Sequence, residues 1–416
     1  MEKNRPAEAP DGVEVDWLVL DLNSFFASCE QQANPHLRNR PIGIVPMQDV
    51  DTTCILAASY EAKHFGVKTG TSVRDAKDMC PGIILLPACH KKYTHYHHKV
   101  MRAIEECTPI QSIMSIDEVA CKLTGSQRQP ENAVKLAQKI KAHIRDTVGE
   151  CLTSSIGLAP NILLAKVGSD MQKPDGLVVI RPCDLPHKLM HLKLQDFSGI
   201  GPRTEKRLNY AGIFSVKDLY GCERKHLRAI WGGVEGERFH AKIWGFNVNR
   251  AETQKSVIGH QHVLEPYLRN TGAAYDVLHH LLMKAAERLR HSNYYCKRLS
   301  VHVKLDFKRG HWVRETDFRE IQDTQFLLHV LHELWQEYPG HRPLRVGVML
   351  HGLVAAAAHQ GDLFEKTKPK QLYEAIDGIN KKFGRHTVNF GLNDYVRQKV
   401  GRDKIAFQSV PDNSYM

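Results

Sequence analysis

Two short apolar runs, far apart in the chain, each lead into acidic residues. Residues 17–20 precede Asp21, and the apolar residues at 113, 114 and 116 precede Asp117 and Glu118. Such runs predict β-strands, so we expect the acids at strand ends. Strands from distant segments can pair in one sheet, which would bring three carboxylates to one edge. Each acid could instead be solvated or cap a helix, but two such strand ends, one with adjacent acids, favour a shared site.

Three converging carboxylates repel one another near neutral pH unless a cation lies between them. Oxygen ligands without Cys or His favour Mg²⁺, which binds through a few carboxylates and substrate phosphates. The backbone carbonyl of Leu22 could add a neutral oxygen ligand beside Asp21. The pattern predicts a two-metal site for phosphoryl or nucleotidyl transfer.

The bulk properties of the chain limit its class. A length of 416 residues predicts two to four domains. The net charge of +11 fits a polyanionic partner, although charge alone is weak support for one. Ten cysteines without a Cys-x-x-Cys pair indicate reduced thiols in a cytoplasmic protein. No apolar run is long enough to span a membrane, and the polar N-terminus predicts a loose tail and not a signal peptide.

Periodicity divides the chain into three parts and a tail. Alternating strands and helices up to about residue 182 predict an α+β or α/β domain, followed by a helical region to about residue 250. Helices at 275–291 and 323–337, with strand runs around them, predict a third, α+β module. From about residue 359 the sequence is polar, and we expect it to be loosely packed. The histidines at 95, 97 and 98 favour a solvated helix face over a metal site.

Aromatic and basic residues near the acids are candidates for binding a nucleotide. Of Phe25 and Phe26, one is expected in the core, whereas the other could lie beneath a nucleotide sugar and exclude a 2′-hydroxyl. Tyr60 and Lys63 share one helix face. They could contact the β- and γ-phosphates of a triphosphate, or form a solvated surface pair. Lys173 lies in a turn fixed by Pro and Gly and could also reach an anion.

Residues 197–204 form a helix-hairpin-helix signature. Gly199 and Gly201 allow close approach of the backbone, and amides at the following helix N-terminus would face a phosphate. Arg203 and Lys206 add attraction to a nucleic-acid backbone. The signature predicts DNA binding that does not depend on sequence.

Two further segments are candidates for contacts with partners. Period-two alternation places Arg298 and Lys304 on one strand face, which is either a DNA-binding or a solvated face. Gln360, Leu363 and Phe364 belong to a short peptide after the third module. An exposed Leu-Phe pair is costly unless something covers it, so the segment could be a docking peptide or could pack back on the body.

The chain resembles the Y-family (DinB/UmuC type) translesion DNA polymerases from about residue 15 to the C-terminus. Five motifs in the family's order carry the likeness, at residues 21–30, 60–67, 115–118, 157–176 and 199–201. The tail is most similar to that of the catalytic subunit of bacterial polymerase V, whereas Tyr60 is more like polymerase IV. The family often has Arg where this chain has Lys63, and lysine keeps the charge but not the bidentate geometry.

The resemblance implies an α+β multidomain fold, a right-handed polymerase with a helical thumb. The expected domains are a loose N-terminal tail at 1–14, a catalytic palm at 15–37 and 93–183, small fingers at 38–92, a thumb with the hairpin at 184–254, an α+β little finger at 255–358 and a C-terminal tail with a clamp-binding-like peptide at 359–416.

The resemblance also implies the chemistry. Asp21, Asp117 and Glu118, with the Leu22 carbonyl, would hold two Mg²⁺ ions for transfer from a dNTP to a primer 3′-hydroxyl. Ser24 would join the nucleotide contacts, and Phe26 would be the steric gate. The expected activity is low-fidelity synthesis past damaged bases, without proofreading, in the DNA damage response. The peptide from Gln360 to Phe364 would bind the sliding clamp, and accessory subunits are possible partners.

Two other functions remain as alternatives. A non-catalytic paralogue would bind DNA and clamp without synthesis, but such a protein is expected to lack the acids, and all three are present. A palm-type nucleotide cyclase also uses strand-end acids and two metals. The hairpin, the basic third module and the Leu-Phe peptide would have no role in a cyclase.

Overall fold

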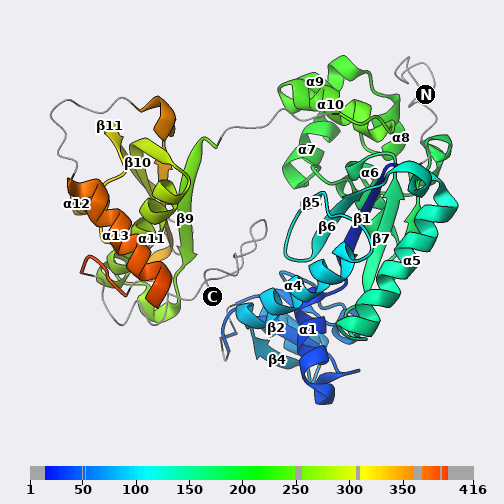
Figure 1. Ribbon diagram of the computed structural model, residues 1–416, viewed down its shortest axis with the longest axis horizontal. Coiled ribbons are helices and arrows are strands. Elements are labelled where there is room, and N and C mark those ends of the chain that lie inside the picture. Colours follow the sequence, from blue (N-terminus) through cyan, green and yellow to red (C-terminus); the bar gives the residue numbers. More distant parts are fainter. Residues whose placement is uncertain are drawn as a thin grey trace. The chain divides into compact units, whose positions relative to one another are not determined.

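The computed structural model describes residues 15–48, 50–51, 53–248, 255–305, 310–359, 368–384 and 387–391 (Figure 1). These residues form two compact units, one within residues 15–248 and the other within 255–391. Each unit has its own hydrophobic core. No helix among the described residues has the length and apolarity needed to cross a membrane.

The first unit is built on a five-stranded sheet in the order β5-β6-β1-β7-β8. Both neighbours of β1 run antiparallel to it, and β8 runs parallel to β7. The strands are β1 (Trp17–Leu22), β5 (Ser112–Ile113), β6 (Glu118–Lys122), β7 (Ser154–Ala159) and β8 (Leu177–Val179).

Helices cover both faces of this sheet. Leu18 and Leu20 belong to a core that includes α1 (Phe25–Ala33), α4 (His90–Glu105) and α5 (Pro130–Thr147). Val19 alternates to the opposite face and packs with α6 (Ile162–Met171). β1 is therefore buried on both sides, which explains why its sequence is a continuous apolar run up to the acid.

The predicted convergence of the acids is confirmed, but the predicted strand before Asp117 is wrong. Ile113 ends the two-residue strand β5 and is 51% exposed, and Met114 to Asp117 form a turn. The buried strand is β6, which begins at Glu118 itself and therefore follows Asp117. Because β6 runs antiparallel to β1, its first residue pairs with Asp21 near the end of β1.

A small module is inserted between α1 and α4. Its sheet has the order β3-β2-β4, and its core lies between this sheet and two short helices. The elements are β2 (Ile42–Val45), β3 (Ala57–Ala58), α2 (Tyr60–His64), α3 (Val73–Met79) and β4 (Ile84–Pro87). The Ser59 hydroxyl caps α2 by accepting a hydrogen bond from the amide of Ala62. This cap fixes the start of the helix that carries Tyr60 and Lys63.

The chain after β8 is helical, as predicted. The helices are α7 (Pro202–Tyr210), α8 (Val216–Gly221), α9 (Arg224–Trp231) and α10 (Val234–Ile243). They pack in the core that also holds α6, so this region is continuous with the central sheet. The buried Tyr220 hydroxyl donates to the carbonyl of Ile243, 2.6 Å away, and ties α8 to the end of α10.

The second unit is a four-stranded sheet, β11-β10-β12-β9, with an additional short strand, β13, on β10. α11 and α12 share the main core with the sheet's apolar face, as the two predicted helices would. The elements are β9 (Val257–Val263), α11 (Thr271–His291), β10 (Tyr294–Leu305), β11 (His311–Ile321), α12 (Thr324–Gln336), β12 (Pro343–His351) and β13 (Val354–Ala355).

The prediction that the chain beyond residue 359 is loosely packed is wrong for α13 (Lys368–Phe383). Tyr373 on this helix is 2% exposed, and its hydroxyl donates to Asp323 at 2.6 Å. Asp377 accepts two hydrogen bonds from the guanidinium of Arg290 on α11, at 2.7 and 2.8 Å. A few specific contacts thus hold a largely polar helix to the second unit.

Gly157 allows α6 to approach β7 closely. A Cβ atom at this position would overlap the backbone carbonyl of Ala165 and crowd the amide of Ser169. We predict that Gly157→Ala lowers the free energy of unfolding by about 1–3 kcal/mol, because α6 would have to move away from the sheet. Gly221→Ala is the control, since a methyl group there meets nothing within 4 Å. Equal stability of the two variants in chemical denaturation would contradict this packing.

Candidate functional site

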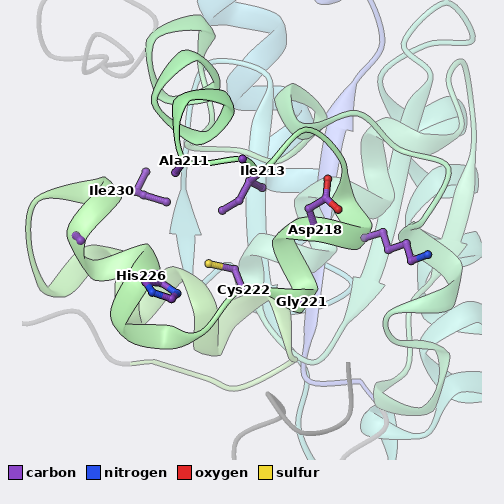
Figure 2. Close-up of a pocket in the computed structure, with 10 residues that line it drawn as sticks. Ala211, Ile213, Asp218, Gly221, Cys222, His226 and Ile230 are labelled. Atoms are coloured by element: carbon purple, nitrogen blue, oxygen red, sulfur yellow. The ribbon is translucent and has the colours of Figure 1, made fainter.

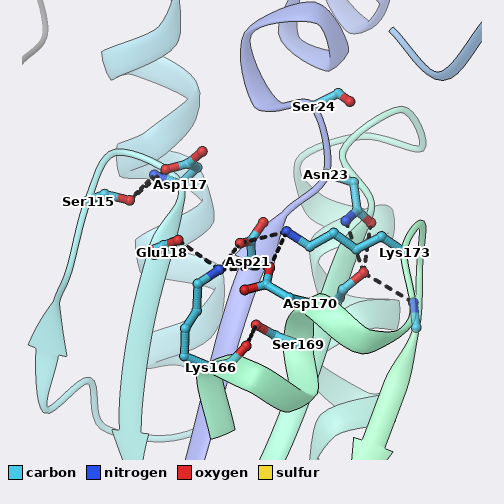
Figure 3. Close-up of polar contacts among 12 residues, drawn as sticks. Asp21, Asn23, Ser24, Ser115, Asp117, Glu118, Lys166, Ser169, Asp170 and Lys173 are labelled. Atoms are coloured by element: carbon cyan, nitrogen blue, oxygen red, sulfur yellow. Dashed lines mark hydrogen bonds and ion pairs between the residues drawn. The ribbon is translucent and has the colours of Figure 1, made fainter. Parts of the chain in front are cut away.

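The three predicted acids lie together at one end of the central sheet (Figure 3). Asp21 pairs in register with Glu118, and Asp117 precedes Glu118 in the β5–β6 turn. The amide of Leu22 donates to the carbonyl of Asp117 at 2.8 Å, so the turn is joined to the end of β1. Asp21 is 6% exposed, which makes its charge costly unless it is paired.

Two lysines lie beside these acids. Lys166 Nζ is 2.5 Å from Asp21, 2.9 Å from Glu118 and 3.0 Å from Asp170. Lys173 Nζ is 2.8 Å from both Asp21 and Asp170. Burial would lower the pKa of each lysine, but the surrounding carboxylates outweigh burial and raise the pKa of both. Both are therefore charged near neutral pH.

Sequence reasoning gave Lys166 and Asp170 no role in the site. Lys166, Asp170 and Lys173 have i, i+4, i+7 spacing, which places three ionisable groups on one side of α6 and the turn after it. That spacing is the signal that could have identified them. The structure brings all three to the predicted acids.

The two lysines do not neutralise the site. Asp117 has no ion pair among the described residues, and its carboxylate instead accepts from the Ser115 hydroxyl at 2.5 Å. Burial raises the pKa of Asp117, and the charge of Asp21 adds to this. Burial also raises the pKa of Glu118, even though Lys166 opposes it. Negative charge thus remains in excess over the two ammonium groups.

The residues fit a divalent cation by their chemistry and charge. Within the part of the chain that the structure describes, no three His, Cys, Asp or Glu side chains form a ready-made metal cage. The ammonium groups lie among these acids instead. The donors are all oxygens, as hard cations prefer, and the raised pKa values of Asp117 and Glu118 mean that an added cation would be favourable.

The predicted nucleotide-binding groups lie next to the acids. Lys63 Nζ donates to the Ser24 hydroxyl at 2.7 Å and lies over the Tyr60 ring, 4.2 Å from its centroid. Burial lowers the pKa of Lys63, and the positive charge of Lys173 lowers it further. Burial raises the pKa of Tyr60, so its phenol stays a hydrogen-bond donor. Because the charge of Lys173 acts on both Tyr60 and Lys63, these three residues lie near one another, and we call them the basic group.

The two phenylalanines have different environments. Phe25 is 3% exposed and lies in the core, as expected for one of the two rings. Phe26 is only partly buried and stacks on Tyr93, with ring centroids 4.2 Å apart and planes 13° apart. The Tyr93 hydroxyl donates to Glu30 at 3.0 Å, which fixes the ring beneath Phe26. Phe26 is thus the ring that remains accessible to a ligand.

Asn23 is a further residue that sequence reasoning missed. It is 1% exposed, its amide nitrogen donates to Ser155 at 3.0 Å, and its oxygen accepts from the backbone amide of Asp175 at 2.8 Å. These bonds connect the end of β1 to β7 and to the loop that carries Lys173. Asn23 therefore holds Lys173 close to Asp21.

The predicted solvated face of histidines is correct only for His95. His97 is 1% exposed, and His98 is partly buried. Tyr93, His97 and Val100 follow i, i+4, i+7 spacing on the buried side of α4, which is the signal that places His97 inside.

The predicted DNA-binding residues lie in two places. Gly199, with φ of 97°, and Gly201 precede α7, and Arg203 and Lys206 are in its first turns. The arm before the hairpin is a single 3-10 turn, Leu194–Asp196, and not an α-helix. A methyl group on Gly199 or Gly201 would meet nothing within 4 Å, so the hairpin is open on that side.

The predicted basic strand face of the second unit is partly neutralised. Arg298 forms ion pairs with Asp317 at 2.6 Å and with Glu315 at 3.3 Å, both on β11. Lys304 is exposed, and no ion pair to it is found within the described residues. Gln360, Leu363 and Phe364 lie outside the described residues.

A cavity of about 600 Å³ lies among α7, α8 and α9 (Figure 2). None of its lining residues belongs to the acid cluster. They are Ala211, Gly212, Ile213, Lys217, Asp218, Gly221, Cys222, His226, Ala229 and Ile230. The acids instead lie at the end of the central sheet, beside Lys63, Tyr60 and Lys173.

Comparison with known proteins shows the family of the chain. Residues 20–170 match the model of the impB/mucB/samB family, and residues 255–363 match its C-terminal domain. DNA polymerase IV of Moorella thermoacetica is 34% identical over 385 residues, covering 89% of this chain and 94% of that protein. DNA polymerase IV of Pelotomaculum thermopropionicum is 32% identical over 378 residues, covering 89% of this chain and 93% of that protein.

Solved structures with a similar fold include a Y-family DNA polymerase chimera of Dbh and Dpo4. It is 25% identical, with a TM-score of 0.68, covering 82% of this chain and 99% of that one. An insertion ternary complex of Dbh DNA polymerase gives a TM-score of 0.55 with the same identity and coverage. The likeness of the tail to polymerase V stays a prediction. The chain belongs to the impB/mucB/samB family, the DinB/UmuC type of Y-family DNA polymerases.

Proposed function

We propose that the site around Asp21, Asp117 and Glu118 carries out template-directed DNA synthesis past damaged bases. A nucleotide would pass from a dNTP to the primer 3′-hydroxyl, with pyrophosphate leaving. The observation that carries this proposal is the register of β1 with β6, which sets Asp21 opposite Glu118 while Lys63, Tyr60 and Lys173 lie beside them. Anionic and cationic groups thus adjoin, as a metal-bound triphosphate requires.

The acids would hold the catalytic cations. Asp21, Asp117, Glu118 and the carbonyl of Leu22 would bind two Mg²⁺ ions, which supply an activated 3′-hydroxyl and charge stabilisation of the pyrophosphate. Lys166 would keep Asp21 and Glu118 oriented through its contacts at 2.5 and 2.9 Å. Oriented carboxylates lose less freedom when the cations bind.

The basic group would hold the triphosphate. Lys63, Tyr60 and Lys173 would donate to its phosphate oxygens, with Ser24 orienting Lys63 through their 2.7 Å hydrogen bond. Phe26 would lie beneath the sugar, where its ring leaves no room for a 2′-hydroxyl. Tyr93 supports Phe26 from below. Phe25 is confined to the core and would act on the nucleotide only by keeping Phe26 in place.

The thumb and the little finger would bind DNA. The central sheet and its helices would be the palm, the module of β2 to β4 the fingers, α7 to α10 the thumb and the second unit the little finger. Gly199, Gly201, Arg203 and Lys206 would contact the DNA backbone from the thumb. Lys304, and Arg298 if it leaves its acidic partners, would do so from the little finger. Small fingers would contact the base pair little, which would account for low fidelity.

We predict that Asp117→Asn lowers the rate of primer extension with Mg²⁺ and dNTPs about a thousandfold, because a cation ligand worth several kcal/mol is lost. Steady-state extension of a labelled primer measures this. Asp146→Asn, at an exposed acid on α5, is the control and should keep full activity. Undiminished synthesis by Asp117→Asn would refute the assignment, whereas DNA binding without synthesis by the wild-type protein would favour the non-catalytic alternative.

A measurement of folding stability distinguishes a loss of activity in Asp117→Asn from misfolding of that variant. The pKa of Asp117 is raised in the folded state, so its ionised form destabilises the fold above that pKa. Asp117→Asn should therefore increase the free energy of unfolding in EDTA at neutral pH. The gain should shrink as the pH falls through the raised pKa toward the ordinary Asp range, where the wild-type carboxyl is protonated. Chemical denaturation at several pH values measures it.

We predict that Phe26→Ala reduces the preference for dNTPs over rNTPs about 10- to 100-fold, because a 2′-hydroxyl would no longer meet the ring. Single-nucleotide incorporation with each substrate gives the selectivity. Phe214→Ala removes a ring that is 70% exposed in the loop before α8, away from the acids, and should leave sugar selectivity as it is. If Phe26→Ala selects sugars like the wild type, Phe26 is not the gate.

We also propose that the peptide from Gln360 to Phe364 binds a replication sliding clamp, since a Leu-Phe pair within a polar stretch of sequence suits an apolar groove. Replacing Leu363 and Phe364 with Ala should weaken clamp binding about tenfold or more and spare synthesis without the clamp. Leu372→Ala removes another apolar side chain, 49% exposed on α13, as the matched control. Equal clamp affinity of the two variants in a binding titration would end this proposal.

A further inference from the structure

His97 on α4 is a buried polar residue close to the acids, but it contacts none of them. Its Nδ1 lies 2.7 Å from the backbone carbonyl oxygen of Ile116, the residue before Asp117. A carbonyl only accepts, so Nδ1 carries the proton. Burial lowers the pKa of His97, so the ring is neutral and held as the Nδ1–H tautomer.

The turn that carries Asp117 and Glu118 has three kinds of anchor. From β1, the Leu22 amide donates to the Asp117 carbonyl at 2.8 Å. Within the hairpin, the amides of Met114 and Ser115 donate to the Glu118 carbonyl at 2.9 and 3.2 Å. His97 supplies the anchor from the helix layer. Of these contacts, the His97 hydrogen bond is the one that a side chain from another element makes.

Asp117 depends strongly on this anchoring. Lys166 and Lys173 hold Asp21, and Lys166 also holds Glu118, but Asp117 has no ion pair within the described part of the chain. Its carboxylate accepts a hydrogen bond from Ser115, a member of the same turn. The position of Asp117 is therefore set by the backbone of the turn.

We propose that His97 is a positioning residue for nucleotidyl transfer, because its hydrogen bond to the Ile116 carbonyl orients Asp117 and Glu118 for cation binding. This inference rests on the proposed role of those acids. Ile116 is 5% exposed, so without His97 its carbonyl would be buried unpaired, at a cost of about 1–3 kcal/mol. The turn relieves this cost by rotating the carbonyl, and the rotation moves the next residue, Asp117.

A small movement is enough to matter. A misplacement of about 1 Å in a catalytic group lowers the rate about 100-fold. The triphosphate would be held by Tyr60, Lys63 and Lys173, which are not attached to the turn. Loss of the His97 bond should therefore lower kcat and weaken cation binding, while KM for the dNTP stays near its wild-type value.

Three substitutions at this position separate the hydrogen bond from packing. His97→Leu removes the donor. His97→Asn places an amide nitrogen near the position of Nδ1, and His97→Gln places one farther out, near Nε2. We expect about a 10- to 100-fold fall in kcat for His97→Leu and His97→Gln, with most of the activity kept in His97→Asn. If His97→Leu does not fold, the Asn and Gln variants still give the comparison.

Cation binding without turnover provides the second readout. Calorimetric titration of the DNA-free protein with Mn²⁺ should give an affinity about 10- to 100-fold weaker in His97→Leu than in the wild type. Val100→Ala, also fully buried on α4, is the control for lost packing. It should lower the melting temperature without changing Mn²⁺ affinity or the ratio of kcat to KM.

The outcomes are distinct. If His97→Leu keeps the wild-type kcat and Mn²⁺ affinity, or changes only as Val100→Ala does, His97 has no positioning role. If Asn and Gln behave alike, the Nδ1 hydrogen bond is not the cause. If Asp117→Asn remains active, the proposed function fails first, whatever the His97 variants do.

Discussion

The antiparallel pairing of β1 with β6 is the constraint on which the rest of the first unit depends. It sets Asp21 against Glu118 in a region with little exposure, and Asp117 follows at the adjoining turn. Like charges this close are unfavourable, and burial strengthens the effect. The pairing therefore requires cations, and α6 brings Lys166 to the two paired acids at 2.5 and 2.9 Å. A helix and a sheet that pack closely, through Gly157, make this compensation possible.

The compensation is incomplete, which is expected of a functional site. Lys166 and Lys173 balance part of the charge, while the pKa values of Asp117 and Glu118 stay raised by burial. Incompletely paired buried carboxylates lower the stability of the fold, and a bound divalent cation would restore it. The basic group around Lys63 adds a place for the negative charge of a triphosphate. The same local imbalance thus accounts for both the electrostatic strain and the proposed chemistry.

Much of the site could be predicted because strands and acids have a strong local signal. The approach of Asp21 to Glu118 needed only two strands that pair. The strand before Asp117 was wrong because apolar content does not reveal exposure, and Ile113 lies in a short edge strand that is half exposed. α13 was missed because its stability comes from Tyr373 and Asp377, whose partners on α12's N-terminus and on α11 are distant in sequence. Histidine type alone suggested a solvated face, whereas the helical stripe shared with Tyr93 buries His97.

By itself, the sequence determined the division into an α+β part, a helical part and a second α+β part, the three carboxylates, the aromatic pair after Asp21 and the family to which the chain belongs. These depend on local periodicity and on residue type. Only the tertiary structure decided that Lys166 lies between the acids, that Phe26 and not Phe25 is accessible, and that His97 holds the carbonyl of Ile116. Each of these is set by contacts between elements far apart in the chain; helical spacing can indicate which face a side chain lies on, but not the partner that it meets there.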